Sequence, residues 1–239
     1  VVMVLTAKDV PVNEYGLIMK DQPVLCGPGS GVVGADIVRF EGDNVALVIA
    51  ESEAIAVEAL KRIVVIYEDL PIVSTLADAL KEGAPILHSR LDSNIFHHNI
   101  VRRGSTDEAF RNCAVIVEGE YQTPVQEHAY LQPESGVAFL DEQGRITVVT
   151  AGQWTHEDQE LIAHALGLPL EQIRVIYPAI GGAFGGREDM SVQIILGLAV
   201  MRLHERGIDR PVRIVWSREE SIIGHCQRHA YTMKAKWGA

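Results

Sequence analysis

The sequence is poor in cysteine, with only Cys26, Cys113 and Cys226, and no two of them stand in a C-x-x-C spacing. Three scattered thiols cannot form an iron–sulfur cluster, a zinc knuckle or a disulfide framework within this chain. Sparse, unpaired cysteines are typical of proteins that work in a reducing compartment, so we expect a cytoplasmic protein.

Positive charge and long apolar runs are also scarce. Lys and Arg number 21 against 32 Asp and Glu, which gives a formal net charge of −11. An acidic surface repels a phosphate backbone, so nucleic acid is not an expected partner. The longest apolar run, within residues 194–201, is interrupted by glycine and is too short to cross a membrane. The chain opens "VVMVLTAKDV", without an initiator methionine or a basic leader.

The composition that remains is that of a globular protein, with 47% hydrophobic residues in a chain of 239. The sequence predicts a strand at residues 45–50, a helix at 51–63 and a second strand at 64–70. This β-α-β unit would close a first domain over residues 1–73. Residues 74–100 predict a surface linker. Residues 101–239 predict a second domain that is incomplete at its C-terminus.

Strands and helices alternate in the second domain, and we therefore predict an α+β fold. Thr155 is the predicted N-cap of its first helix, since acidic residues follow it. The predicted strands cover residues 114–123, 136–140, 146–151, 173–178, 212–217 and 231–239, and the predicted helices cover 156–168, 187–207 and 218–227.

One glycine motif, "GSGVVG" at Gly29 to Gly34, matches the G-x-G-x-x-G pattern of dinucleotide-binding proteins. The pattern needs a helix that begins inside it, yet the residues that follow favour a strand. We interpret the motif as a surface turn, and a dinucleotide-dependent dehydrogenase is kept as a rival hypothesis.

The nine histidines suggest no metal site by their spacing. "HEDQE" at 156–160 is not H-E-x-x-H, because position 160 is Glu160. His225 and His229 are four residues apart and could share a helix face, but no third ligand lies nearby in the sequence. We therefore assign no metal-ligating residue.

A second glycine-rich stretch, "IGGAFGG" at 180–186, lies between a predicted strand and a predicted helix. Glycines leave room for main-chain amides to face a bound oxyanion or metal-oxo group, and the dipole of the following helix would add partial positive charge. A tight turn that requires positive φ is the alternative explanation. The residues alone leave both open.

Four stretches together carry a family resemblance: "QEHAYLQPES" at 126–135, "TAGQWTHEDQ" at 150–159, "GGAFGGRE" at 181–188 and "REESIIGHCQRHAY" at 218–231. In this order they resemble the molybdenum hydroxylases, the family of xanthine dehydrogenase and aldehyde oxidase. The first 73 residues resemble the α/β hammerhead domain of that family. The resemblance implies a hammerhead domain followed by the first part of a molybdopterin-binding domain.

The resemblance also implies roles for particular residues. Gln153 would hydrogen-bond an oxo ligand of molybdenum, and Glu188 would hydrogen-bond a purine or a related N-heterocycle. The cofactor would lie against Gly182, Ala183, Phe184, Gly185 and Gly186. For Glu188 the simpler alternative is an acid that complements a helix dipole, and for Gln153 it is a polar residue at the end of a strand. Gln132 and Arg187 depart from common family residues and are expected to lie outside the chemistry.

The resemblance implies a molybdenum-pyranopterin cofactor, for which a cytosine dinucleotide form is one option. Iron–sulfur clusters and FAD would sit on other domains or subunits, and the family's catalytic glutamate would lie beyond residue 239. The expected partners are thus the remaining molybdopterin-domain polypeptide, these redox units and a small-molecule substrate that is hydroxylated with water as oxygen source. The rivals are an aldehyde oxidoreductase of the same family and a non-catalytic scaffold without cofactor.

Overall fold

The computed structural model describes residues 1–239 and mixes helices with strands, which confirms the predicted α+β class. The strands are β1 Met3–Leu5, β2 Leu47–Ile49, β3 Ile116–Thr123, β4 Ser135–Leu140, β5 Ile146–Thr150, β6 Ile173–Ile176, β7 Val212–Val215 and β8 Tyr231–Gly238. The helices are α1 Glu53–Leu60, α2 Leu76–Ala79, α3 Thr106–Arg111, α4 Thr155–Leu166, α5 Gln193–His204 and α6 Arg218–Gly224, with short 3-10 turns at Ala7–Asp9 and Leu170–Gln172.

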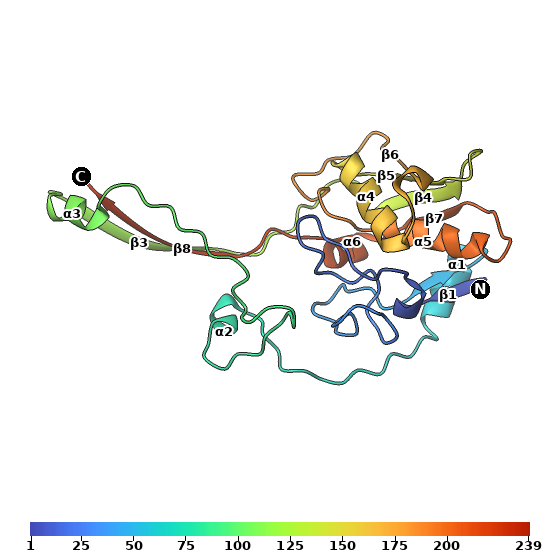
Figure 1. Ribbon diagram of the computed structural model, residues 1–239, viewed down its shortest axis with the longest axis horizontal. Helices are drawn as coiled ribbons and strands as arrows, with labels where there is room; N and C mark the ends of the chain where they lie inside the picture. Colours follow the sequence, from blue (N-terminus) through green and yellow to red (C-terminus); the bar gives the residue numbers. More distant parts are fainter.

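A four-stranded sheet in the order β6-β5-β4-β7 organises the larger body of the molecule. β4 is antiparallel to both β5 and β7, whereas β5 and β6 are parallel and are connected through α4. A parallel pair needs a crossover of this kind, because its two strands enter the sheet from the same end. Helices α4 and α5 pack beside each other on this sheet (Figure 1).

Helix α5 forms the centre of the hydrophobic core. Nine of its 12 residues are buried, because it is apolar around most of its circumference and is covered on both sides. The core joins Leu196 and Leu198 of α5 with Met3, Leu5 and Ile49 of the small β1–β2 sheet. The first 50 residues therefore share a core with the second half of the chain.

A long two-stranded ribbon, β3 with β8, projects away from the rest of the molecule and carries α3 near its tip (Figure 1). The strands are antiparallel, with Ile116 opposite Gly238 and Thr123 opposite Tyr231. Nearly all of their side chains are exposed, including Val117 and Trp237. A two-stranded ribbon with no covering layer is at best marginally stable in water, so this one needs a further surface to pack against.

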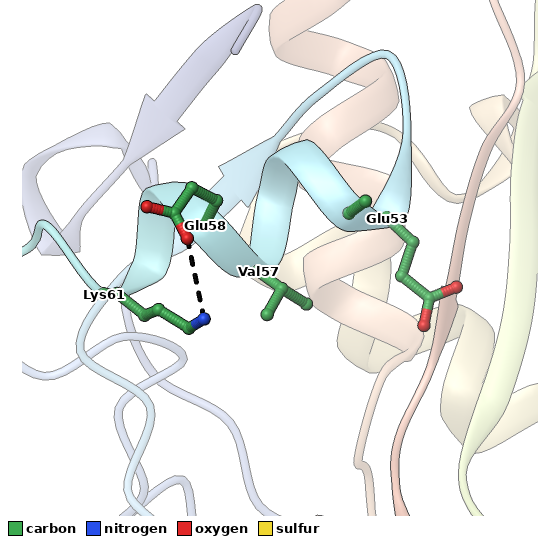
Figure 2. A pocket seen from close by; sticks show the side chains of 5 residues that line it. Glu53, Val57, Glu58 and Lys61 are labelled. Atoms are coloured by element: carbon green, nitrogen blue, oxygen red, sulfur yellow. Dashed lines mark ion pairs between the residues drawn. The ribbon is translucent and has the colours of Figure 1, made fainter.

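Helix α1 has the predicted position but buries none of its residues. A shallow hollow follows its outer face beside Glu53, Val57, Glu58 and Lys61, and Lys61 pairs with Glu58 at 3.5 Å (Figure 2). This hollow is lined by a single helix and its C-cap residue, and its ion pair is exposed, so it is not a strong candidate for a binding site.

The strand predicted at residues 64–70 does not form. No strand of this chain pairs with it, and Val64 and Ile66 are 84% and 92% exposed. The β-α-β unit predicted for the first domain is therefore wrong. In its place, β2 pairs with β1 in an antiparallel manner. An apolar, β-branched run predicts strand propensity, but a strand also needs a neighbour for its main-chain groups.

Two predicted helix starts are also wrong. Thr155 is the first residue of α4 rather than its N-cap, and the capping position is held by Trp154, whose side chain makes no capping hydrogen bond. Helix α5 begins at Gln193 and not at Arg187, since residues 187–192 form bends and turns. None of the helices is both long and apolar enough to cross a membrane.

Candidate cofactor site

The glycine loop, residues 181–186, follows β6 and has an unusual backbone. Gly182 and Gly185 have φ of 107° and 89°, which glycine adopts at little cost. Phe184 between them also has a positive φ, 52°, and its side chain is 77% exposed. A bulky residue held in this region is strained by about 1–3 kcal/mol, and such strain clusters at functional sites.

The other two glycines allow close packing against the segment 128–132. A Cβ atom on Gly186 would lie 2.8 Å from His128 and 2.9 Å from Tyr130, and one on Gly181 would lie 3.2 Å from Gln132. Positive φ thus accounts for Gly182 and Gly185, as the turn alternative expects, and close packing accounts for Gly181 and Gly186. Support for binding must come from the polar groups that the loop presents.

The loop presents main-chain donors that the chain itself does not use. The N–H of Gly186 closes a turn by donating to Ala183 at 2.8 Å, but the N–H groups of Phe184 and Gly185 donate to no acceptor in the chain. Both residues are exposed. Two adjacent free amides on a strained, exposed turn are suited to the oxygen atoms of a bound group.

Gln153 lies beside this loop and presents a further donor. Its Oε1 accepts a hydrogen bond from the main-chain N–H of Arg187 at 3.2 Å, and its own N–H donates to the Arg187 carbonyl at 3.0 Å. Because an N–H can only donate, the amide atom that faces Arg187 must be the oxygen. Nε2 of Gln153 is therefore left without a partner on an exposed side chain.

Beneath the loop, Arg187 is held by a buried ion pair. Its guanidinium is 4% exposed and donates to Glu134 at 3.1 Å, while the Glu134 side chain is fully buried. Arg187 also donates to the carbonyl oxygen of Gln132 at 3.0 Å and lies 3.8 Å from the centre of the Tyr130 ring. Burial, and then the hydrogen bond that the Tyr130 hydroxyl donates to the Glu134 carboxylate, raise the pKa of Tyr130. These contacts fix the start of residues 187–192 against the segment 130–134.

Gln132 and Arg187, which the sequence placed outside the chemistry, support the loop structurally. Oε1 of Gln132 accepts a hydrogen bond from the N–H of Gly181 at 2.5 Å, and the main chain of Arg187 holds Gln153. Both residues brace the loop from below. A buried pair between residues 53 positions apart, such as Arg187 and Glu134, has no local signal in a sequence.

Glu188 follows Arg187 and is partly exposed, and its carboxylate forms no hydrogen bond or ion pair within the chain. Because α5 begins at Gln193, Glu188 lies before the first turn of the helix and does not complement its dipole. Because α5 begins several residues after the glycine loop, its dipole does not supply positive charge to the loop either. The structure brings Gln153 and Arg187 together, whereas Glu188, the residue after Arg187, forms no hydrogen bond with Gln153.

The remaining motifs lie elsewhere. Gly29 to Gly34 form turns with no helix after them, in agreement with the surface-turn interpretation. His225 and His229 do not share a helix, because α6 ends at Gly224. His225 is buried and instead lies near Glu127 and His128, two residues that the sequence did not single out.

The loop is a strained turn with free amides, and it lies next to the glutamine donor and the buried ion pair. Such a surface is suited to an oxygen-rich group. Residues 87–239 match the family model of the molybdopterin cofactor-binding domain, and residues 1–71 match the a/b hammerhead domain of aldehyde oxidase and xanthine dehydrogenase. The chain belongs to the molybdopterin cofactor-binding family, as the resemblance predicted.

Individual relatives agree with this membership. The chain is 37% identical to the nicotinate dehydrogenase large molybdopterin subunit of Eubacterium barkeri over 95% of its own length and 50% of that subunit. It is 35% identical to a probable xanthine dehydrogenase subunit of Bacillus subtilis, over 99% of its length and 30% of the relative. The aldehyde oxidoreductase structure from Desulfovibrio gigas superposes with a TM-score of 0.88 at 25% identity, covering 99% of this chain and 26% of that one. The chain thus spans half or less of the length of these relatives.

Proposed function

We propose that this chain forms the molybdopterin-binding part of a molybdenum hydroxylase that oxidises purines or related N-heterocycles. One observation carries the proposal: Nε2 of Gln153 and the N–H groups of Phe184 and Gly185 are unused hydrogen-bond donors on one exposed loop system. A pyranopterin with a molybdenum centre is rich in oxygen acceptors, so these donors fit it.

When bound, the cofactor would supply two-electron oxidation with water as the oxygen source. The residues of this chain would bind and orient it. Gln153 and the loop amides would donate hydrogen bonds to its oxygen atoms in a fixed geometry, which is the kind of preorganised polar environment that stabilises developing charge. Arg187 and Glu134 would keep the loop in place through their buried pair.

The preference for an N-heterocycle depends on Glu188. A partly exposed carboxylate with no partner in the chain is available to accept a hydrogen bond from a ring N–H. Two relatives are named after heterocyclic compounds: a nicotinate dehydrogenase subunit and a probable xanthine dehydrogenase subunit. An aldehyde substrate is the second candidate, favoured by the match to an aldehyde oxidoreductase structure.

The proposal includes partners, because much apolar surface is uncovered. The ribbon of β3 and β8, helix α1 and the segment 64–70 expose residues such as Val57, Ile66 and Trp237. Further molybdopterin-domain polypeptide would cover them. Iron–sulfur and FAD units on other domains or subunits would carry the electrons, and the three free cysteines of this chain leave that role to them. A cytosine dinucleotide tail, the cytoplasmic location and the domain limits at residues 73 and 100 belong to the same proposal.

The decisive experiment is metal and mass-spectrometric analysis of the assembled enzyme that contains this chain. We expect one molybdenum and one pterin for each copy of the chain, together with iron and flavin on its partners. An assembly with its partners present but without molybdenum or pterin would establish the scaffold alternative. Nicotinamide dinucleotide bound at Gly29 to Gly34 would instead support the dehydrogenase alternative.

A matched pair of glycine variants tests the loop itself. Gly186→Ala would place a methyl group against His128 and Tyr130 and push the loop outward, whereas Gly31→Ala meets nothing within 4 Å. We expect the first variant to lose bound molybdenum and the second to retain it. Equal molybdenum content in both would contradict the loop as the cofactor site.

A further inference from the structure

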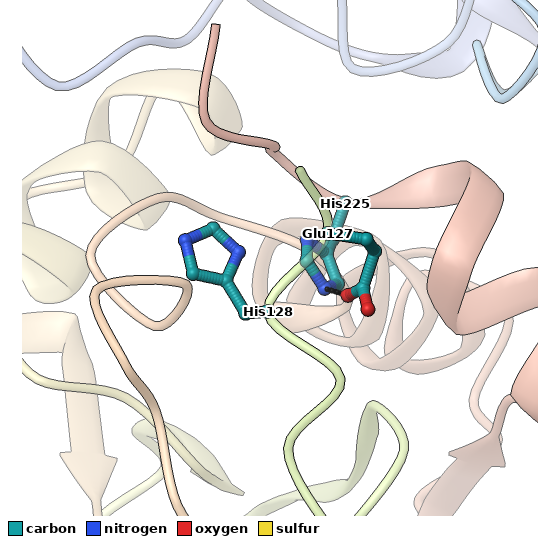
Figure 3. A group of neighbouring side chains, drawn as sticks. All are labelled: Glu127, His128 and His225. Atoms are coloured by element: carbon teal, nitrogen blue, oxygen red, sulfur yellow. Dashed lines mark ion pairs between the residues drawn. The ribbon is translucent and has the colours of Figure 1, made fainter. Parts of the chain in front are cut away.

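Glu127, His128 and His225 form a compact cluster beside the glycine loop, and each offers one ligand atom within 4.8 Å of the others (Figure 3). Glu127 and His128 follow the ribbon strand β3, and His225 stands directly after α6. From these three residues we infer a second metal site, one for a zinc-like divalent cation, that does not depend on the molybdenum cofactor.

His225 is oriented as a metal ligand. Its side chain is 2% exposed, and its ring stacks on Tyr130 with the centroids 5.1 Å apart and the planes at 17°. Nδ1 of His225 contacts the carbonyl oxygen of Cys226, and since a carbonyl can only accept, Nδ1 carries the proton. A second group that fixes the tautomer in this way is typical of metal-binding histidines, and it leaves the lone pair on Nε2.

Nε2 of His225 lies close to a carboxylate. Nε2 of His225 lies 2.6 Å from Oε1 of Glu127, but the two are not aligned as a hydrogen bond, and both atoms are buried without a hydrogen-bond partner. Oε2 of Glu127 is occupied, because it accepts the N–H of Ala129 at 2.5 Å. Two acceptors this close repel each other unless a positive charge lies between them.

His128 supplies the third acceptor. Its Nδ1 is also buried and has no hydrogen-bond partner, and its ring centroid lies 5.7 Å from that of His225. Glu127 Oε1, His128 Nδ1 and His225 Nε2 are thus three buried atoms without a hydrogen-bond partner. Buried polar atoms need a partner, and one bound cation would satisfy all three at once. Water would complete the coordination from the side where Glu127 and His128 are partly exposed.

Two imidazoles with one carboxylate are a ligand set that Zn²⁺ favours over Mg²⁺ or Ca²⁺, which prefer oxygen ligands. Ligands of a tetrahedral Zn²⁺ at about 2.0–2.2 Å from the ion are separated by roughly 3.3 Å. Binding would therefore move Glu127 and His225 slightly apart and draw His128 inward. The ion would join the end of α6 to the segment that supports Gly186, which packs against His128.

The test uses the assembled enzyme, treated with a chelator and then dialysed against buffered Zn²⁺. We expect one zinc for each copy of this chain, in molybdenum-containing and molybdenum-free enzyme alike, and an X-ray absorption spectrum at the zinc edge that shows two imidazole ligands. Glu127→Gln, His128→Asn and His225→Asn should each weaken zinc binding by about 10-fold or more. His229→Asn is the control, since His229 is exposed and outside the cluster.

A simple ion pair between Glu127 and a protonated His225 is the competing interpretation. It predicts no bound zinc in the wild-type enzyme, and that result would overturn the site. Zinc binding that survives in Glu127→Gln and His128→Asn, or that is lost equally in His229→Asn, would also overturn it. The partly exposed Glu127 and His128 keep the test valid if the buried His225 variant does not fold.

Discussion

The main chain of Arg187 and the residue Gln153 bind each other through two hydrogen bonds, one from the Arg187 N–H to Oε1 of Gln153 at 3.2 Å and one from the Gln153 N–H to the Arg187 carbonyl at 3.0 Å. The pair joins segments 34 positions apart and directs Nε2 of Gln153 outward. The position of this one donor therefore depends on the backbone of Arg187, and the Arg187 side chain in turn anchors that backbone.

Gln153→Glu separates the two functions of the side chain. The carboxylate can still accept the Arg187 N–H, but the outward donor is replaced by an acceptor. We expect turnover to fall by about 100-fold or more, the loss seen when one preorganised donor is removed, while the melting temperature changes little. Steady-state kinetics and calorimetry on the assembled enzyme measure both. Turnover equal to that of the wild type would refute the role assigned to Gln153.

Glu188→Val tests substrate choice. A hydrogen bond to a charged group contributes about 1.5–3 kcal/mol, so kcat/KM for a purine should fall by roughly 10- to 150-fold. An aldehyde without a ring N–H should be oxidised at an unchanged rate. Kinetics with both substrates on one preparation give the comparison. An equal loss for both would remove the preference for N-heterocycles.

Arg187→Met breaks the buried ion pair and leaves the Glu134 charge alone in the interior. Loss of one partner of such a pair costs about 3–5 kcal/mol, so this variant should melt at a much lower temperature. Adding Glu134→Gln removes the isolated charge and should recover part of the loss. The melting temperatures of the two single variants and the double variant form the measurement. Losses that simply add would show that the pair is not coupled.

Phe184→Gly relieves the strained backbone at φ 52°. The free energy of unfolding should rise or stay level, because glycine accepts this conformation and the strain is about 1 kcal/mol or more. We expect activity to fall at the same time, since Phe184 is held in this geometry against a cost to stability. Denaturation and turnover are measured in parallel. A variant that is both less stable and fully active would contradict this explanation of the strain.

Asp158 makes the stability depend on pH. Burial raises the pKa of its carboxyl to about 6, even though Tyr177 and Gln193 donate hydrogen bonds to it. Because the folded pKa lies above the unfolded value of 3.8, the stabilising contribution is complete below pH 4 and is lost as the pH rises through 6. The shift corresponds to about 3 kcal/mol.

Asp158→Asn keeps an acceptor for both donors and removes the titration. The melting temperature of the wild type, relative to this variant, should therefore decline between pH 4 and pH 7. Parallel melting curves across that range test it, and a constant difference would show that Asp158 does not titrate there.

Periodic and apolar patterns in the sequence were enough to predict the α+β class, the position of α4 and the strands of the second domain. They failed where structure depends on a neighbour. Residues 64–70 have strand composition but no pairing partner in the chain, and residues 187–192 read as helix although the burial of Arg187 holds them in turns. Helix propensity is a weak local preference that such tertiary contacts override.

The residues of the candidate site were likewise predicted only in part. Gln153 and the residues Gly182 to Gly186 were reached through a motif, and their role as cofactor contacts stays a prediction. Glu134, Tyr130 and the cluster of Glu127, His128 and His225 could not be predicted, because each acquires its meaning from a residue far away in the sequence. Gly186 shows the limit most clearly: the sequence suggested an open backbone for a ligand, whereas the structure fills that space with His128 and Tyr130.

The projecting pair of β3 and β8 has a practical consequence for anyone who handles this chain alone. Each strand has one side whose main-chain groups bond to no neighbour, and apolar side chains such as Val117 and Trp237 flank them. Unpaired strand edges of this kind can pair with a strand from a second copy of the chain. Production without a covering polypeptide will thus favour edge-to-edge aggregation, and co-expression with polypeptide that covers the ribbon should reduce it.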